Sequence, residues 1–405
     1  MSKLIKKWND SSLVGRIIVG IIIGVILAVV APKASAIAML GTLFISALKA
    51  VAPILVFVLV LQAISSHTAG TKTNMKTVLV LYAVGTLLAG TVGVIASKLF
   101  PVKLTLKESV TDIAPPQNVW EVMQTLLQNI VANPVDALLS ANYIGILAWA
   151  IVLGFAFKKA NDSTKTFINN SAEAVTKVVQ WVISLAPIGI VGIVFDAISS
   201  NGFNALKEYG TLIIILVGSM LFIALVVNPL IVFVATRRNP YPLVFTTIKE
   251  SGITAFFTRS SGANIPINMR LSEKLGLNKD TYAVSIPLGA TINMAGAAVT
   301  ISVLTLSAAY TLNINVDIPT AIILMVVAAV SAAGASGVPG GSLLLIPLAC
   351  GLIGIPADVA MQIIGVGYVI SVVQDSFETA LNSSSDVVFT AAAEYANERK
   401  EAVKN

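Results

Sequence analysis

Four polar residues near the end of the chain repeat at the spacing of one helical face. They are Asp375, Glu378, Asn382 and Asp386. Steps of three, four and four positions place side chains one above another on a helix, and most of the residues around them are apolar. Carboxylates inside a membrane are energetically expensive and by default mark a binding site or an ion pathway. The function of this polar stripe therefore depends on whether the chain lies in a membrane.

The composition is that of a membrane protein. Hydrophobic residues make up 56% of the 405 residues and charged residues 11%, whereas a soluble domain carries about 25% charged residues. Several apolar segments are long enough to cross about 30 Å of hydrocarbon as helices. They span residues 13–31, 36–66, 77–100, 138–157, 173–198 and 209–236. The long polar segment 103–136 is expected to be a loop outside the cytoplasm, with irregular or short helical structure.

The N-terminal segment and the loop charges predict the orientation. Lysines before the first apolar run, and Ala34–Ala36 after it, resemble a secretory signal. We expect a spanning helix instead, because the run is longer than a typical signal core and further apolar segments follow. Lys and Arg gather in the loops on the side of the N-terminus, so we predict a multi-pass protein of the bacterial cytoplasmic (inner) membrane with both termini inside. The net charge of +6 then fits contact with anionic membrane lipid and requires no nucleic-acid partner.

Two apolar segments in the last part of the chain are broken in the middle. Residues 241–275 contain the polar run Thr258–Gly262, and residues 319–355 contain a run rich in glycine at 334–342. Glycine and proline cannot continue a helix without a cost of about 1 and 3 kcal/mol each. We predict a re-entrant hairpin for each segment, where irregular backbone at membrane depth packs against protein or water. A cytoplasmic loop with an amphipathic helix is the alternative for the first.

A broken helix and a polar helix follow these hairpins in turn. The helix predicted at 280–312 is interrupted at Thr291–Gly296, and local unwinding there would expose backbone carbonyls that can bind a cation. The last helix, 357–396, carries the polar stripe. The order of hairpin, broken helix, hairpin and polar helix forms an internal repeat of inverted topology. Such repeats with discontinuous helices point to the binding site of a secondary transporter.

Four ordered motifs resemble one transporter family. They are Thr258-Arg259-Ser260-Ser261, Pro287-Leu288-Gly289-Ala290-Thr291-Ile292-Asn293-Met294, Gly337-Val338-Pro339-Gly340 and Asn382-x-x-x-Asp386. Together they are similar to the signatures of the dicarboxylate/amino acid:cation symporter family, the glutamate-transporter-like proteins. The resemblance implies an all-α polytopic protein with eight transmembrane helices, two re-entrant hairpins and no enzymatic activity. It also implies a homotrimer that works as an elevator.

The same resemblance divides the chain into two functional parts. A scaffold that forms the trimer would comprise helices 1 and 2 in residues 1–66 and helices 4 and 5 in residues 138–200. A mobile transport domain would comprise helix 3 at 77–100 and residues 209–396, which hold helix 6, both hairpins, helix 7 and helix 8. In such proteins the transport domain moves against the scaffold.

The resemblance also assigns the binding residues. The substrate carboxylate would lie at the tip of the first hairpin with Asn382, and Asp375 would accept the ammonium group. One sodium ion would be held by carbonyls of Gly289, Asn293 and Asn382 with the carboxylate of Asp386, and a second by Thr291 with three carbonyls at the start of the second hairpin. The full substrate set is Ser260, Ser261, Gly337, Val338, Pro339, Asp375, Glu378 and Asn382, and the three carbonyls belong to Ala332, Ala333 and Ala335.

Departures from the family pattern predict the substrate. Transporters of acidic amino acids carry an Arg where this chain has Glu378, and a Thr where it has Ala297. Both partners of a side-chain carboxylate are thus missing, so a small neutral substrate is expected, with serine or threonine first. Aspartates that bind a further sodium are replaced by Ala295 and Ser371, which predicts fewer coupled sodium ions. Arg259 is either a partner of Glu378 or Asp375, since buried charges are usually paired, or an arginine that faces the cytoplasm.

Several alternatives remain open at this point. A sodium- or proton-coupled symporter of another small amino acid or a dicarboxylate, such as alanine, cysteine or aspartate, would fit the same architecture. A channel would need a continuous polar pore, whereas the polar residues cluster in one C-terminal compartment. A membrane enzyme would need a nucleophile beside a base or a cluster of metal ligands. The expected cargo is thus an amino acid with co-transported Na⁺.

Overall fold

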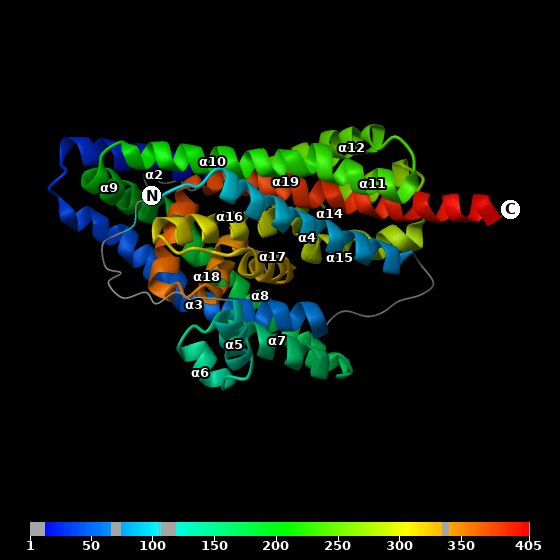
Figure 1. The fold of residues 1–405 in the computed structure, drawn as a ribbon, viewed down its shortest axis with the longest axis horizontal. Helices are drawn as coiled ribbons and strands as arrows, with labels where there is room; N and C mark the ends of the chain where they lie inside the picture. The colour runs from blue at the N-terminus through cyan, green and yellow to red at the C-terminus, as the bar shows by residue number, and fades with distance from the viewer. Residues whose placement is uncertain (1–12, 66–73, 105, 107–118, 334–339, 405) are drawn as a thin grey trace, which may run out of the picture.

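The computed structural model describes residues 13–65, 74–104, 106, 119–333 and 340–404. All regular elements within these ranges are helical, and the longest helices run along the long axis of the molecule (Figure 1). An all-helical protein was predicted, and this is confirmed for the described residues. Some predicted site residues lie outside them, namely Ala335, Gly337, Val338 and Pro339.

One group of helices packs through glycines. It contains α2 (Leu13–Val30), the short helix η1 (Ser35–Ile37), α3 (Ala38–Ser65), α7 (Tyr143–Phe157), α8 (Asp162–Ser184) and α9 (Ala186–Asn201). A Cβ placed on Gly24 of α2 would come within 2.9 Å of the Val191 carbonyl oxygen in α9, and one on Gly41 of α3 within 2.8 Å of the Ile193 nitrogen. Small residues of this kind allow membrane helices to approach closely. We call this set of helices the first helix group.

The predicted span at 173–198 is wrong as a single helix. The helical segment begins earlier, at Asp162, and α8 and α9 meet at Leu185 with a bend of 49°. Pro187 stands in the first turn of α9. Proline has no N–H to donate to the preceding turn and its ring clashes with that turn, so a continuous helix cannot pass this point without a kink.

A second group of long helices surrounds the core of the protein. It contains α4 (Met75–Leu99), α10 (Asn204–Phe222), the π-helical turn η2 (Ile223–Val227) and α11 (Asn228–Thr236). The π turn precedes Pro229, whose missing N–H interrupts the regular ladder. The polar segment 103–136 contains two short helices, α5 (Val119–Ile130) and α6 (Pro134–Leu139), which agrees with the expected short helical structure.

The first hairpin has the predicted two arms. Its first arm comprises α12 (Tyr241–Thr247), the π-helical turn η3 (Ile248–Gly252) and α13 (Ile253–Thr258), and its second arm is α14 (Ser261–Lys274). Arg259 ends α13 in the left-handed conformation, with φ of 52°. The hydroxyl of Ser260 then accepts a hydrogen bond from the N–H of Ala263 and caps α14. The segment is therefore two helices that meet at a tip, as predicted.

The predicted break in the helix at 280–312 is present, and the structure describes the two arms of the second predicted hairpin. Helix α15 (Lys279–Ile292) and helix α16 (Ala295–Thr311) are separated at Asn293 and Met294. The second hairpin has α17 (Ile318–Ala332) as one arm and the short helices η5 (Gly341–Leu345) and α18 (Ile346–Leu352) as the other, while its tip lies largely outside the described residues. Asp317 caps α17, and hydrogen bonds from the hydroxyl and the N–H of Thr320 lower the pKa of this carboxyl group.

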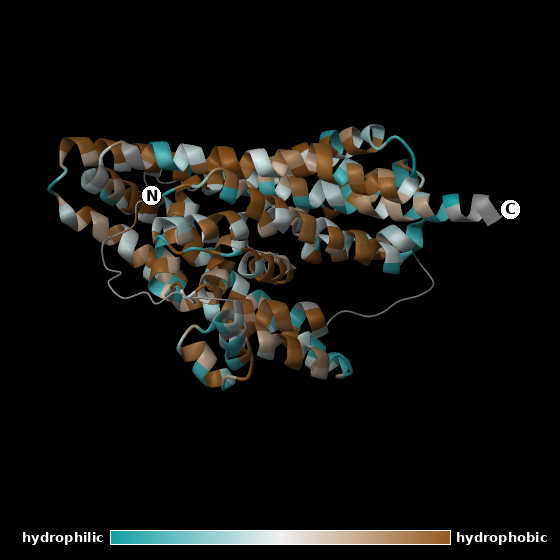
Figure 2. Ribbon diagram, in the orientation of Figure 1, coloured by the Kyte–Doolittle hydropathy of each residue, from teal (hydrophilic) through white to brown (hydrophobic). Residues whose placement is uncertain are grey.

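The polar helix α19 (Ala357–Lys404) extends beyond the predicted end at residue 396, and its last turns project past the neighbouring helices (Figure 1). An 18-residue apolar stretch of Lys279–Thr311 is 94% buried within the protein and one of Ala357–Arg399 is 72% buried, against 39–50% for the corresponding stretches of the other long apolar helices. Apolar residues cover much of the outer helices (Figure 2). The broken helix and the polar helix therefore form the core, wrapped by apolar helices.

Five helices in the described residues are long and apolar enough to cross a membrane, or six if the bent pair α8–α9 counts as one span. Eight were predicted. The difference arises because α2 and α7 are shorter apolar helices within the described ranges and a crossing needs about 20 residues. The protein is thus a helical protein with several membrane-spanning helices.

Candidate substrate and sodium site

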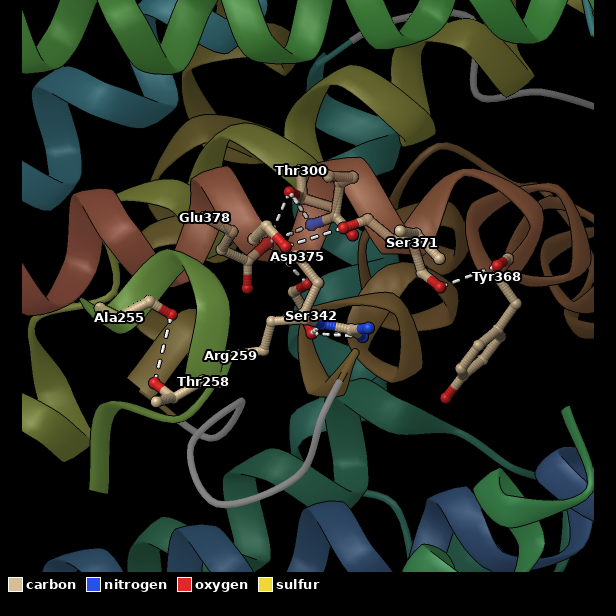
Figure 3. Close-up of polar contacts among 12 residues, drawn as sticks. Ala255, Thr258, Arg259, Thr300, Ser342, Tyr368, Ser371, Asp375 and Glu378 are labelled. Atoms are coloured by element: carbon tan, nitrogen blue, oxygen red, sulfur yellow. Dashed lines mark hydrogen bonds and ion pairs between the residues drawn. The ribbon is translucent and has the colours of Figure 1, made fainter. Parts of the chain in front are cut away.

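The tip of the first hairpin meets the polar helix through an ion pair. The Nε of Arg259 donates to Oδ2 of Asp375 at 2.8 Å, and its Nη2 lies 2.7 Å from the same oxygen (Figure 3). The two side chains are only 9% and 6% exposed. Arg259 was expected to pair with Glu378 or Asp375 or to face the cytoplasm, and the structure shows that it pairs with Asp375. The left-handed backbone at the tip turns the chain so that the Arg259 side chain reaches the polar stripe.

Glu378 lies one turn further along the same face and contacts only neutral donors in the described chain. Its Oε2 accepts hydrogen bonds from Gln374 Nε2 at 2.5 Å, Thr300 Oγ1 at 2.7 Å and Ser342 Oγ at 2.9 Å. These donors come from α19, α16 and η5. Glu378 is 5% exposed, so the three hydrogen bonds stabilise a carboxylate that has little contact with solvent.

Asn382 joins the polar helix to the start of α16. Its Oδ1 accepts a hydrogen bond from the N–H of Gly296 at 2.7 Å, which satisfies one of the free N–H groups at the start of this helix. Its Nδ2 lies 3.4 Å from the sulfur of Met294, a weak acceptor. The amide oxygen is therefore occupied, and the amide N–H groups can still bind a stronger acceptor such as the carboxylate of an amino acid.

Asp386 lies against the break between α15 and α16. Its Oδ1 accepts from Asn293 Nδ2 at 2.9 Å, and the same nitrogen lies 3.3 Å from the backbone oxygen of Asn382. A Cβ on Gly289 would come within 2.5 Å of Oδ1 of Asp386. The structure therefore brings together all four residues predicted for the first sodium site.

The donor set at this break fits a sodium ion. Oδ2 of Asp386 and Oδ1 of Asn293 are buried and accept no hydrogen bond, and buried oxygens of this kind usually have a partner. A hard cation prefers oxygen ligands from carboxylates and carbonyls. No group of three or more His, Cys, Asp or Glu that could hold a metal occurs in the described residues, so a transition-metal site has no support in this part of the chain.

The predicted second sodium site is described only in part. The hydroxyl of Thr291 donates to the backbone oxygen of Leu288 at 2.7 Å. Ala332 and Ala333 lie at the C-terminal end of α17, where carbonyls lack helical partners, and Ala335 lies outside the described residues. This site stays a prediction.

Two positions that carry aspartate in the acidic transporters hold neutral residues in this chain. Ala295 is fully buried at the start of α16, and the hydroxyl of Ser371 donates to the Tyr368 carbonyl oxygen at 2.8 Å (Figure 3). The number of coupled sodium ions stays a prediction.

Several residues of this compartment were not predicted from the sequence. Gln374, Thr300 and Ser342 surround Glu378, and Tyr82 of α4 lies 3.3 Å from the Asp386 backbone oxygen. Gln374 could have been found, because it stands four positions before Glu378 on the same helical face. The other residues lie on distant parts of the chain, and only the tertiary structure brings them to the polar stripe.

Comparison with known proteins identifies the family. Residues 13–395 match the sodium:dicarboxylate symporter family. The chain is 58% identical over 395 residues to the serine/threonine transporter SstT of Streptococcus agalactiae serotype Ia, and equally to that of serotype V, covering 97% of this chain and 98% of each relative. The family consists of transporters, which confirms that the chain is not an enzyme. With three of the four family motifs placed around one buried compartment in the described residues and a match over nearly its whole length, the chain belongs to the sodium:dicarboxylate symporter family.

Proposed function

We propose that this protein takes up serine and threonine together with sodium across the bacterial cytoplasmic membrane, with both termini in the cytoplasm. The relatives are named serine/threonine transporters and the family is named for sodium symport. The observation that carries the choice of substrate is Glu378. In the described chain it forms no ion pair and is held by neutral donors, so a substrate with an anionic side chain would be repelled there.

The substrate zwitterion binds between the first hairpin and the polar helix. Its carboxylate lies at the N-terminus of α14, where Ser261 and the backbone N–H groups favour an anion, and receives the Nδ2 of Asn382. Its ammonium group binds Asp375 and takes the place of the Arg259 guanidinium. Each charge of the substrate then has an opposite charge or a set of donors in a site that excludes water.

Sodium binds at Asp386 and couples uptake to the sodium gradient. The ion is cargo, and its oxygen ligands come from α15, from the break that follows it and from α19. Asn382 takes part in both sites, through its backbone oxygen for sodium and its side chain for the substrate. Binding of one ligand therefore orders a residue that the other ligand needs, which is a physical route to coupled binding.

The substrate crosses the membrane because one part of the chain moves against the other. The first helix group forms a scaffold and a homotrimer, and the core helices with both hairpins move against it as an elevator. The site is carried entirely by the hairpins, α15, α16 and α19, so it can move as one unit. Contacts with membrane lipid are made by the apolar outer helices.

Uptake by purified protein in liposomes tests this function. Labelled serine should accumulate with an inward sodium gradient and should not accumulate when potassium or a proton gradient replaces it. Unlabelled threonine should compete, and unlabelled aspartate should not. Strong inhibition by aspartate would contradict the neutral substrate and favour a dicarboxylate, whereas uptake driven by protons alone would contradict sodium coupling.

A further inference from the structure

The two oxygens of the Glu378 carboxylate are used differently. All three hydrogen bonds to described residues converge on Oε2. Figure 3 shows the other oxygen without a dashed line, on the side where Ala255 and Arg259 of the first hairpin lie. Among the described residues the carboxylate is therefore held through Oε2, and the other oxygen lies toward the first hairpin.

The orientation of Glu378 is set by residues that contact each other. Gln374 Nε2 donates both to Glu378 Oε2 and to Thr300 Oγ1, at 2.5 and 2.9 Å, while Ser342 contributes a separate donor at 2.9 Å. A Cβ on Gly296 would lie 2.9 Å from both Cα and Cγ of Glu378, so the backbone of α16 packs directly against this side chain. Side chains fixed in this way present a preorganised acceptor.

We propose that Glu378 recognises the hydroxyl group of serine or threonine by accepting its hydrogen bond at Oε1, and that Gln374, Thr300 and Ser342 are positioning residues for it. This inference rests on the proposed function. Glu378 stands three positions after Asp375, and side chains at this spacing lie about 5–6 Å apart. An amino acid whose hydroxyl is on the carbon next to Cα can thus bind Asp375 with its ammonium and Glu378 with its hydroxyl.

This arrangement selects for a hydroxyl donor rather than for small size. A carboxylate oxygen accepts a hydrogen bond from O–H, and this bond is of the strong, charge-assisted kind when the carboxylate is ionised. Alanine fills the same space and leaves the buried acceptor without its partner, and a site built to bind a hydroxyl discriminates strongly against the analogue that lacks it. A pocket selective for size alone would accept alanine as well as serine.

The test compares alanine and serine as inhibitors of labelled threonine uptake in liposomes. In the wild type the inhibition constant of alanine should exceed that of serine by about ten- to a hundredfold. In Glu378→Gln the three donors keep the amide oxygen at the Oε2 position, so the NH₂ group faces the substrate and cannot accept the hydroxyl hydrogen bond. The ratio of the inhibition constant of alanine to that of serine should then fall by about tenfold.

Two milder variants and a control keep the result interpretable. Ser342→Ala and Thr300→Val each remove one donor to Glu378 and should lower the ratio partially while uptake persists. Glu394→Gln makes the same chemical change at another buried glutamate of α19, 8% exposed and bonded to the N–H of Asn278, and should leave the ratio unchanged. The inference is overturned if the wild-type ratio is near one, or if the ratio is unchanged in Glu378→Gln and in both milder variants. Neither result contradicts serine uptake itself. Loss of serine uptake in the wild type would instead refute the proposed function.

Discussion

At the residue scale, the central feature is that Asp375 already has a cationic partner. Arg259 is held in a left-handed backbone conformation, which is unfavourable for a residue with a side chain, and its guanidinium binds Asp375. A buried ion pair is costly to break by removing one partner, because the other charge is left without compensation. A substrate ammonium that replaces the guanidinium keeps Asp375 paired with an opposite charge, so the cost of the exchange falls on Arg259.

The variant Asp375→Asn should abolish serine uptake. The neutral amide cannot balance the ammonium group, and loss of one side of a buried charge pair costs about 2–5 kcal/mol, or at least about thirtyfold in affinity. Binding of serine to the purified variant, measured by calorimetry at saturating sodium, tests this directly.

The matched control is Asp358→Asn, which makes the same change in the exposed first turn of α19 and should leave binding and uptake unchanged. Thermal unfolding of both variants shows whether the protein remains folded. Near-normal uptake by folded Asp375→Asn protein would contradict the ammonium assignment.

At the element scale, the breaks in the helices create the site. The interruption at Asn293 and Met294 places the side-chain amide of Asn293 beside Asp386 and gives α16 a free N-terminus that Asn382 binds. The first hairpin is fastened to the polar helix by another network, in which Asn264 and Asn268 bind the hydroxyl of Ser383 at 2.8 and 3.1 Å. Continuous helices would bury all these backbone groups in their own hydrogen bonds and could not bind an ion.

The variant Gly289→Ala should weaken sodium binding. The new methyl group would come within 2.5 Å of Asp386 Oδ1 and 2.7 Å of the Tyr82 hydroxyl, both of which are buried. Overpacking costs about 1–3 kcal/mol, so the sodium concentration for half-maximal uptake should rise by about tenfold or more. Sodium titration of serine uptake measures this change.

Gly218→Ala is the corresponding control, because a Cβ on this glycine of α10 meets nothing within 4 Å. Its sodium dependence should equal that of the wild type. An unchanged sodium dependence in Gly289→Ala would remove this glycine from the predicted sodium site.

At the scale of the whole molecule, the core helices touch the first helix group through a limited set of side chains. Phe44 of α3 packs edge-on against Tyr368 of α19, with ring centroids 5.3 Å apart. A Cβ on Gly365 would lie 3.0 Å from Cδ1 of Ile45. If the two bodies slide past each other during transport, these contacts must break and form again in each cycle.

A covalent link between α3 and α19 should therefore stop transport. Ile45→Cys with Gly365→Cys, built on a Cys350→Ala parent that has no other cysteine, should lose serine uptake on oxidation and regain it on reduction. The measurement is uptake in the same liposomes before and after a reducing agent.

The single variants Ile45→Cys and Gly365→Cys on the same Cys350→Ala parent are the controls. Neither can form the link, so their serine uptake should not respond to oxidation. Full uptake by the completely cross-linked Ile45–Gly365 pair would contradict movement of the transport domain against the scaffold at this contact.

The amino-acid sequence by itself determined the helical membrane architecture, the two arms of the first hairpin, the break at Asn293 and the polar stripe. These features depend on local properties, namely hydropathy, the helix-breaking effect of glycine and proline, and the spacing of residues on a helical face. For the same reason the helix ends were less well predicted, as at Leu185, where the bend divides a segment that is apolar on both sides.

Only the tertiary structure decided which groups meet at the stripe. Asp375 and Glu378 lie on one face of one helix, so the sequence could not tell which of them Arg259 would reach from a hairpin more than a hundred positions away. The donors to Glu378 come from Thr300 and Ser342, which are 78 and 36 positions distant. Contacts between elements depend on how whole helices pack, and this packing turns a stripe of polar residues into a site with one paired and one hydrogen-bonded carboxylate.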